Sequence, residues 1–114
     1  MYVEDGVAII TLQHGRMNSL HPKLLSSLFS NLQQADLDSK VEAIVITGKN
    51  NFSAGFDIPS FVKYQESGQD MEDMNPYFNA LLESSHKPTV AAIEGTALGG
   101  GLEVAMACNG RICA

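Results

Sequence analysis

The sequence predicts one α/β domain built on a parallel β-sheet. Three apolar runs rich in β-branched residues lie at 7–12, 43–47 and 89–93, and segments with helical periodicity separate them. A helix between two strands favours parallel pairing, because the chain must return to the same end of the sheet. The 114 residues suffice for one small domain or a piece of a larger one, and they exclude two independent domains.

The first strand and the first helix follow from local signals. Asp5-Gly6 is a turn pair before the run at 7–12, and this run barely alternates, so we expect a largely buried strand. Pro22 suits the first turn of a helix. The apolar residues that recur after it at helical spacing are Leu24, Leu25, Leu28, Phe29 and Leu32. This stripe is expected to face the core.

The second strand is followed by helical pieces. The strand at 43–47 is also predicted to be buried, and the turn at 48–51 closes it. Residues 61–69 and 74–83 have helical character, and a polar, acidic loop at 66–70 separates them.

The third strand leads into a glycine-rich helix. After the strand at 89–93, Gly99-Gly100-Gly101 precedes an apolar stretch at 102–107, which predicts a tightly packed, buried helix. Residues 111–114 resemble the opening of a fourth strand. A parallel sheet needs covered faces and protected edges, so we expect an incomplete domain, completed by further polypeptide or by a partner.

Composition excludes several classes of function. Seven basic against thirteen acidic residues give 7 − 13 = −6, which disfavours broad nucleic-acid binding. The apolar runs are too short for a membrane span, and the acidic start does not resemble a secretory signal, so export is not expected. Cys108 and Cys113 lack a second Cys/His pair for zinc, so we expect two buried thiols and no metal site.

Two strand-to-helix junctions, at 47–57 and 93–103, are the candidate ligand-binding loops. Both lie at carboxyl ends of strands, where open α/β folds bind ligands. Glycines near a helix start leave backbone N–H groups free to bind an anion. Two such groups that converge would form an oxyanion hole for a reacting carbonyl oxygen. Taken alone, however, glycines after strands are common turn formers.

The side chains near these junctions leave alternatives open. Glu103 is either exposed on the far side of its helix or buried with a raised pKa suited to acid/base chemistry. Asp57 suits a helix cap. Ser53 lacks a nucleophile-elbow pattern, and the glycine segment matches neither a dinucleotide motif nor a P-loop. The three histidines are expected at the surface: His14, His21 and His86.

Several blocks in order resemble the enoyl-CoA hydratase/isomerase, or crotonase, superfamily. The residues that carry this resemblance are Asn18 with Leu20, 45–48, 52–58, 87–93 and 97–103. Residues 105–108 with 111–112 are most similar to the N-terminal hydratase domain of plant-type peroxisomal β-oxidation multifunctional proteins. The resemblance implies the N-terminal part of a crotonase-like ββα spiral, so that residues 1–114 form a partial domain.

The same resemblance implies a function and a set of site residues. The substrates are acyl-CoA thioesters of fatty-acid β-oxidation, and coenzyme A is part of the substrate, so no cofactor is implied. By motif, Ala54 and Gly100 supply the two oxyanion-hole N–H groups, and Glu103 acts on the water that is added. The residues implied to bind the substrate are Arg16, Asn18, Leu20, Ala54, Gly55, Phe56, Asp57, Ile58, Gly99 and Gly100. A trimer of complete domains and a peroxisomal location are also implied.

Departures from the family pattern weaken the case for full activity. A second catalytic glutamate of the family is expected beyond residue 114, so hydratase activity of this chain is left open. An anionic CoA must rely on local cations such as Arg16 or Lys23, given the net charge of −6. The alternative is a catalytically impaired crotonase-like fragment that acts as an interaction or regulatory module.

Overall fold

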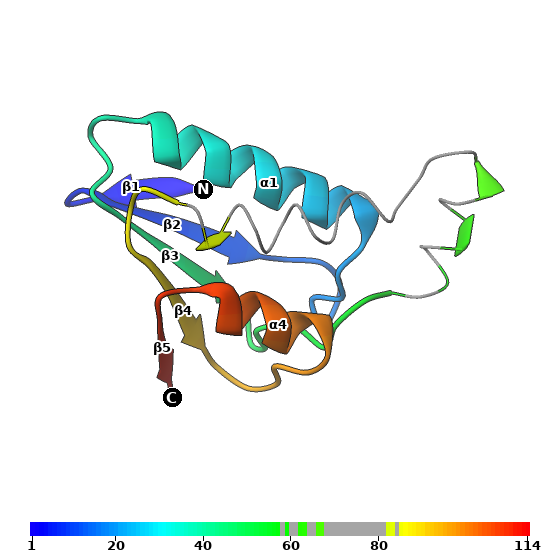
Figure 1. The fold of residues 1–114 in the computed structure, drawn as a ribbon. Coiled ribbons are helices and arrows are strands. Elements are labelled where there is room, and N and C mark those ends of the chain that lie inside the picture. Colours follow the sequence, from blue (N-terminus) through cyan, green and yellow to red (C-terminus); the bar gives the residue numbers. More distant parts are fainter. Residues whose placement is uncertain (58, 60–61, 64–65, 68–81, 84) are drawn as a thin grey trace.

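The computed structural model describes residues 1–57, 59, 62–63, 66–67, 82–83 and 85–114. Within this part, the core is a five-stranded sheet with the order β1-β2-β3-β4-β5 (Figure 1). The strands are β1 (Tyr2–Glu4), β2 (Val7–Leu12), β3 (Ala43–Gly48), β4 (Thr89–Ile93) and β5 (Gly110–Cys113). From β2 to β5 all neighbours are parallel, so the predicted parallel sheet and its fourth strand are confirmed. The helical pieces and the acidic loop predicted between 61 and 83 fall mostly outside the described residues.

An antiparallel hairpin precedes the parallel strands. Asp5 (φ 51°) and Gly6 (φ 80°) both have left-handed backbone conformations, which match the twist of a two-residue hairpin turn. Glu4 therefore pairs with Val7 across this turn. The sequence analysis identified the turn but not β1, because its three exposed residues show no hydrophobic pattern.

The first helix, α1 (Pro22–Leu37), begins where the sequence predicts. Pro22 occupies the first helical position, and the imidazole of His21 accepts a hydrogen bond from the N–H of Lys23 at 3.1 Å. A side chain from another part of the chain caps the C-terminal end of this helix. The ammonium of Lys87, which lies just before β4, donates to the carbonyl oxygens of Ala35 and Asp38. A cation suits the negative end of the helix dipole.

The second described helix, α4 (Gly100–Ala107), packs closely on one side only. Gly100, Gly101, Val104 and Ala105 are buried, whereas Leu102 is 42% and Met106 65% exposed. The prediction of a helix buried all round is therefore wrong for the described chain. Leu102 and Met106 are four residues apart, so they lie on the same face of α4, and this face points away from the core.

Burial in the strands alternates. In β2 and β3 every second residue is buried and most of the others are half-buried, so both strands are largely buried, as predicted, but one face is covered more completely than the other. Both helices contribute to one hydrophobic cluster on the buried face of the sheet. Its members are Ala8, Ile10, Leu12, Leu20, Leu25, Leu28, Leu32, Ala35, Val41, Ile44, Ile46, Phe52, Leu82, Ala91, Val104, Ala105 and Cys108.

The two cysteines differ in environment. Cys108 is buried, and this burial raises the pKa of its thiol, while a hydrogen bond with Thr89 and the charge of Arg111 act in the opposite direction. Cys113 is exposed on β5, so the prediction that both thiols are buried is wrong for Cys113. Among the described residues, no three His, Cys, Asp or Glu side chains form a group that could hold a metal ion. None of the described helices has the length and hydrophobicity that crossing a membrane requires.

The contribution of α1 to the core can be measured with two leucines of the same helix. Leu28 is 1% exposed in the core, whereas Leu37 is 85% exposed at the helix end. We expect Leu28→Ala to lower the free energy of unfolding by about 2–5 kcal/mol through lost burial and a cavity. Leu37→Ala should change it by less than about 0.5 kcal/mol. Urea denaturation measures both, and equal losses would contradict the packing described here.

Candidate active site

Three loops lie side by side at the carboxyl ends of the parallel strands (Figure 1). The loop after β3 forms isolated parallel bridges to both neighbours, Leu20 with Phe56 and Ser53 with Ala97. The N–H of Ser53 donates to Thr96 O, and the N–H of Leu98 donates to Ser53 O, both at 3.0 Å. The two glycine-rich junctions of the sequence are thus held together by backbone hydrogen bonds.

Their closest approach is at Gly55 and Gly100. Gly55 has φ +102°, and a Cβ there would lie 3.1 Å from Leu98 O and 3.3 Å from Gly100 N. A Cβ on Gly100 would collide with the ring of Phe56. Only residues without a side chain permit this contact between the turn and the first residue of α4.

One N–H group at this contact has no acceptor among the described residues. Gly100 is the buried first residue of α4, and no carbonyl or side chain of the described chain accepts its N–H. The N–H groups at a helix start carry the positive end of the dipole. Gly100 therefore fits its predicted role as a hydrogen-bond donor.

The predicted partner of Gly100 does not fit. The N–H of Ala54 donates to Met17 O at 3.0 Å, so it is already used inside the protein. The neighbouring N–H of Gly55 donates to Ser53 Oγ at 3.2 Å. The N–H of Ala54 is therefore not available for the role that the resemblance implied.

The peptide between Gly55 and Phe56 has a defined orientation. Leu20 N–H donates to Gly55 O at 2.7 Å, and the peptide bonds of the described chain are trans. In a trans peptide the C=O and the following N–H point in opposite directions. The N–H of Phe56 therefore points away from Leu20.

Glu103 lies on the first turn of α4 and is exposed. It lines a shallow pocket of about 300 Å³ together with Glu83, Met106 and Ala107. Of the two alternatives that the sequence left open, the structure shows the exposed carboxylate. Gly100 and Glu103 are three residues apart, so they lie on the same face of the helix.

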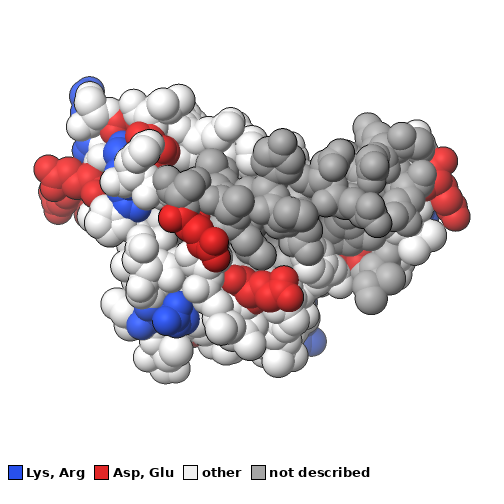
Figure 2. Space-filling view, viewed as in Figure 1, with Lys and Arg blue, Asp and Glu red and all other residues white. Residues whose placement is uncertain are grey.

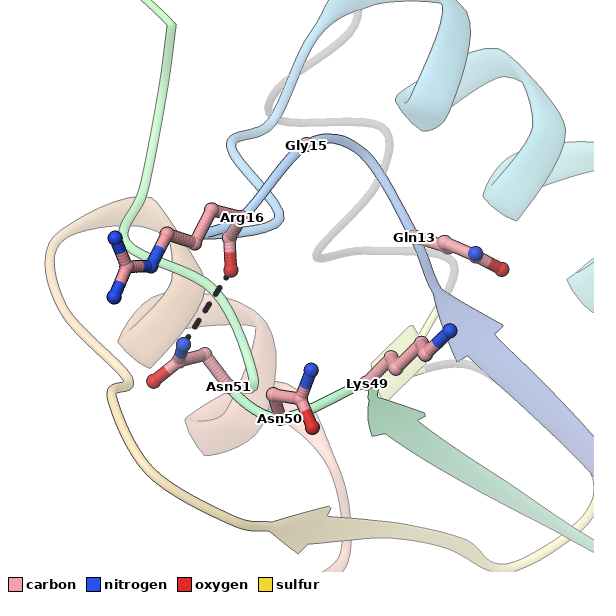
Figure 3. A pocket seen from close by; sticks show the side chains of 6 residues that line it. All are labelled: Gln13, Gly15, Arg16, Lys49, Asn50 and Asn51. Carbon is pink, nitrogen blue, oxygen red and sulfur yellow. Dashed lines mark hydrogen bonds between the residues drawn. The ribbon is translucent and has the colours of Figure 1, made fainter.

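A second pocket, of about 450 Å³, opens between the loops after β2 and β3 (Figure 3). Its lining residues are Gln13, Gly15, Arg16, Lys49, Asn50 and Asn51. The lining includes two cations and no acidic residue. Arg16 and Lys49 stand on opposite sides of the pocket, and the amide of Asn51 donates to Arg16 O at 3.4 Å.

Lys49 was not among the predicted site residues. The sequence analysis treated 48–51 only as a turn, although this turn follows a strand that neighbours β2 in the sheet. Lys23, the other cation considered, is exposed on α1 and does not line the pocket. On the face shown in Figure 2, acidic side chains occupy several separate places and basic ones form small groups. In a chain with a net charge of −6, the attraction of an anionic ligand depends on local cations such as Arg16 and Lys49.

Several predicted binding residues support the loops from inside. Asn18 is 1% exposed and Leu20 0%, so their side chains do not reach a ligand surface. Asp57 is half-buried, and its N–H donates to Leu20 O at 3.3 Å. Ile58 and most of the helix that Asp57 was predicted to cap lie outside the described residues. Gly99 is exposed with φ 52° and forms the N-cap of α4.

Asn51 connects all three loops, and sequence reasoning missed it. Its Oδ1 accepts the N–H of Thr96 at 2.9 Å, and its amide donates to Arg16 O. A Cβ on Gly95, which has φ +66°, would collide with the Asn51 side chain. The only signal in the sequence was a polar pair directly after a buried strand.

Residues 3–114 match the family model described as enoyl-CoA hydratase/isomerase. The chain belongs to this family. It is 50% identical to a peroxisomal fatty acid beta-oxidation multifunctional protein of Arabidopsis thaliana, over 96% of this chain and 16% of that protein. It is 41% identical to a probable enoyl-CoA hydratase of Bacillus subtilis, over 98% of this chain and 45% of that protein.

Solved structures of enoyl-CoA hydratase/isomerase proteins have the same fold. One from Xanthobacter autotrophicus matches with a TM-score of 0.80 and 30% identity, over 98% of this chain and 44% of that chain. One from Silicibacter pomeroyi matches with a TM-score of 0.88 and 26% identity, over 98% and 50%. The predicted fold class, the N-terminal part of a crotonase-like α/β domain, is confirmed. The chain spans about half the length of these structures and 16% of the plant relative.

Proposed function

We propose that this chain supplies the thioester-binding part of an enoyl-CoA hydratase/isomerase site in fatty-acid β-oxidation. The observation that carries the proposal is the contact between the Gly55–Phe56 turn and the first residue of α4. This contact joins a helix N-terminus to a turn whose peptides are held in a fixed orientation. Such an arrangement suits a carbonyl oxygen that gains negative charge during the reaction.

The oxyanion hole in this proposal is built on the N–H group of Gly100. Gly100 is supported by its position at the start of α4 and by its lack of an internal acceptor among the described residues. Ala54 is not part of the proposed oxyanion hole, because its N–H donates to Met17 O. A Cβ on Gly100 would collide with the ring of Phe56, so the turn after β3 lies directly against this donor.

The anionic groups of CoA are proposed to bind in the pocket between Arg16 and Lys49. A net charge of −6 repels an anionic ligand at long range, whereas two nearby cations attract it at short range. Apart from the CoA of the substrate, no cofactor is part of the proposal. Assembly into trimers and a location in the peroxisome, where several relatives act by name, are also proposed for the complete protein.

Glu103 is proposed to act on the water that adds to the 2,3-double bond. Its carboxylate lies one turn after Gly100 on the same helical face, and it lines an open pocket that water can enter. The oxyanion hole would stabilise the enolate-like thioester while Glu103 orients and deprotonates the water.

A second candidate function is an interaction or regulatory module with impaired catalysis. It is favoured by exposed apolar side chains around α4 and the last strand of the sheet. These are Leu98, Leu102, Met106 and Ile112. β5 also has no further strand beside it among the described residues. A chain that binds no acyl-CoA would support this candidate over the first.

The role of Glu103 can be tested by following crotonyl-CoA hydration through the loss of absorbance at the enoyl band. We expect Glu103→Gln to lower the rate by about 10²–10⁴-fold while binding is retained, because the amide cannot accept the proton. Glu42→Gln is the matched control, since Glu42 is exposed just before β3, at the end of the strand away from the site. Equal absorbance loss in the wild type and in Glu103→Gln would exclude a catalytic role for Glu103.

The role of Arg16 can be tested by titrating CoA calorimetrically at two salt concentrations. We expect Arg16→Gln to weaken binding about two- to fivefold at low salt, the range typical of one exposed charge contact. The difference should shrink at high salt because of screening. Lys40→Gln removes the same charge from an exposed residue just beyond α1, away from the pocket. If both variants weaken binding equally, net charge rather than the pocket is responsible.

A further inference from the structure

We infer that Asn18 and Asn51 form an amide clamp, in which each side chain holds the main chain of a cation on the opposite wall of the pocket between Arg16 and Lys49. The clamp sets the spacing of the two cations, so both asparagines are positioning residues for the anionic groups of CoA. This role rests on the proposed function, which places those groups in the same pocket.

The two walls of the pocket come from different loops. Gly15 and Arg16 belong to the loop after β2, whereas Lys49, Asn50 and Asn51 belong to the loop after β3 (Figure 3). Arg16 and Lys49 are both exposed. The relative position of the two charges therefore depends on the main chain from which each side chain extends.

Asn18 holds the wall that carries Lys49. Its amide donates to Lys49 O at 3.1 Å and to Asn51 O at 2.6 Å, while its Oδ1 accepts the N–H of His14 at 3.1 Å. Asn18 is 1% exposed, so losing these bonds would leave buried polar groups unpaired. The N–H of Lys49 also donates to Leu12 O at 3.4 Å. The main chain of Lys49 is thus held at both its N–H and its C=O.

Asn51 holds the wall that carries Arg16. Its Oδ1 accepts the N–H of Thr96 at 2.9 Å, and only the oxygen of an amide can accept, so the amide nitrogen faces the loop after β2. This nitrogen donates to Arg16 O at 3.4 Å and to Met17 Sδ at 3.7 Å (Figure 3). A Cβ on Gly95 would collide with Asn51 Oδ1, so the loop after β4 confines the amide.

The two asparagines act across the pocket in opposite directions. Asn18 comes from the loop of Arg16 and holds Lys49, whereas Asn51 comes from the loop of Lys49 and holds Arg16. A change in the width of the pocket must therefore break hydrogen bonds of both amides. Cations that are held at a fixed spacing before the ligand arrives bind an anion more tightly than cations on independent loops, because less ordering is left to occur on binding.

Two variants and one control test the clamp. Asn51→Ala removes one arm and leaves both cations in place. Asn18→Gly removes the other arm and keeps a residue that accepts the φ of +50° at this position. Asn109→Ala is the matched control, because Asn109 Oδ1 accepts the N–H of Thr89, also at 2.9 Å, at the amino-terminal end of β4 and away from the pocket. Thermal unfolding followed by circular dichroism verifies that each variant is folded.

The measurement is calorimetric titration of CoA into the full chain. We expect Asn51→Ala to weaken binding about two- to fivefold at low salt, the range expected for Arg16→Gln, and Asn109→Ala to leave it unchanged. In the Arg16→Gln background, Asn51→Ala should have no further effect, because residues that act through one another are not additive. Asn18→Gly should likewise have no further effect in the Lys49→Gln background. The single effects should shrink at high salt, which a general loss of stability would not cause.

The outcomes distinguish this role from the proposed function. A wild-type chain that binds no CoA, or binds it equally well after Arg16→Gln and Lys49→Gln, overturns the proposed pocket and the clamp with it. Binding that Arg16→Gln weakens and Asn51→Ala leaves unchanged overturns the clamp alone. The clamp is also overturned if Asn51→Ala has its full effect in the Arg16→Gln background, or if Asn109→Ala weakens binding equally. Should Asn51→Ala not fold, Asn18→Gly with Lys49→Gln decides by the same criteria.

Discussion

The close contact between Gly55 and the start of α4 is the constraint on which the candidate site depends. Neither Gly55 nor Gly100 has room for a Cβ without disturbing the other loop or the ring of Phe56. The contact brings a helix N-terminus within reach of a turn that belongs to another strand. Backbone dipoles held in this way need no reorganisation when charge develops on a ligand, which is the physical basis of an oxyanion hole.

The sheet explains why this contact forms. Parallel strands end at the same edge, so the loops after β2, β3 and β4 meet there although they are far apart in the sequence. Side-chain amides then connect these loops, with the buried Asn18 joining the first two and the half-buried Asn51 joining all three. A polar side chain as buried as that of Asn18 must find such partners, and here its partners are the loop backbones themselves.

Much of the fold was predictable, and the reasons are local. Proline at a helix start and apolar residues at helical spacing predicted α1, and β-branched runs predicted three of the parallel strands. The glycine-rich junctions also predicted two of the loops that lie side by side at the candidate site. That the Ala54 N–H is used inside the protein was not predictable, because its acceptor, Met17 O, lies in another loop and is reached only after folding. Lys49 was not predicted as a site residue for a similar reason, because the pocket that it lines forms only when the ends of two strands become neighbours.

The most direct test of the central claim is NMR of the backbone amides with two ligands, crotonyl-CoA and a thioether analogue that lacks the carbonyl oxygen. The difference between the two spectra isolates the hydrogen bonds to that oxygen. The account predicts a downfield shift of the Gly100 amide proton with the thioester only, while the Ala54 amide, already bound to Met17 O, stays unchanged. A carbonyl-dependent shift at Ala54, or identical spectra with both ligands, would contradict it.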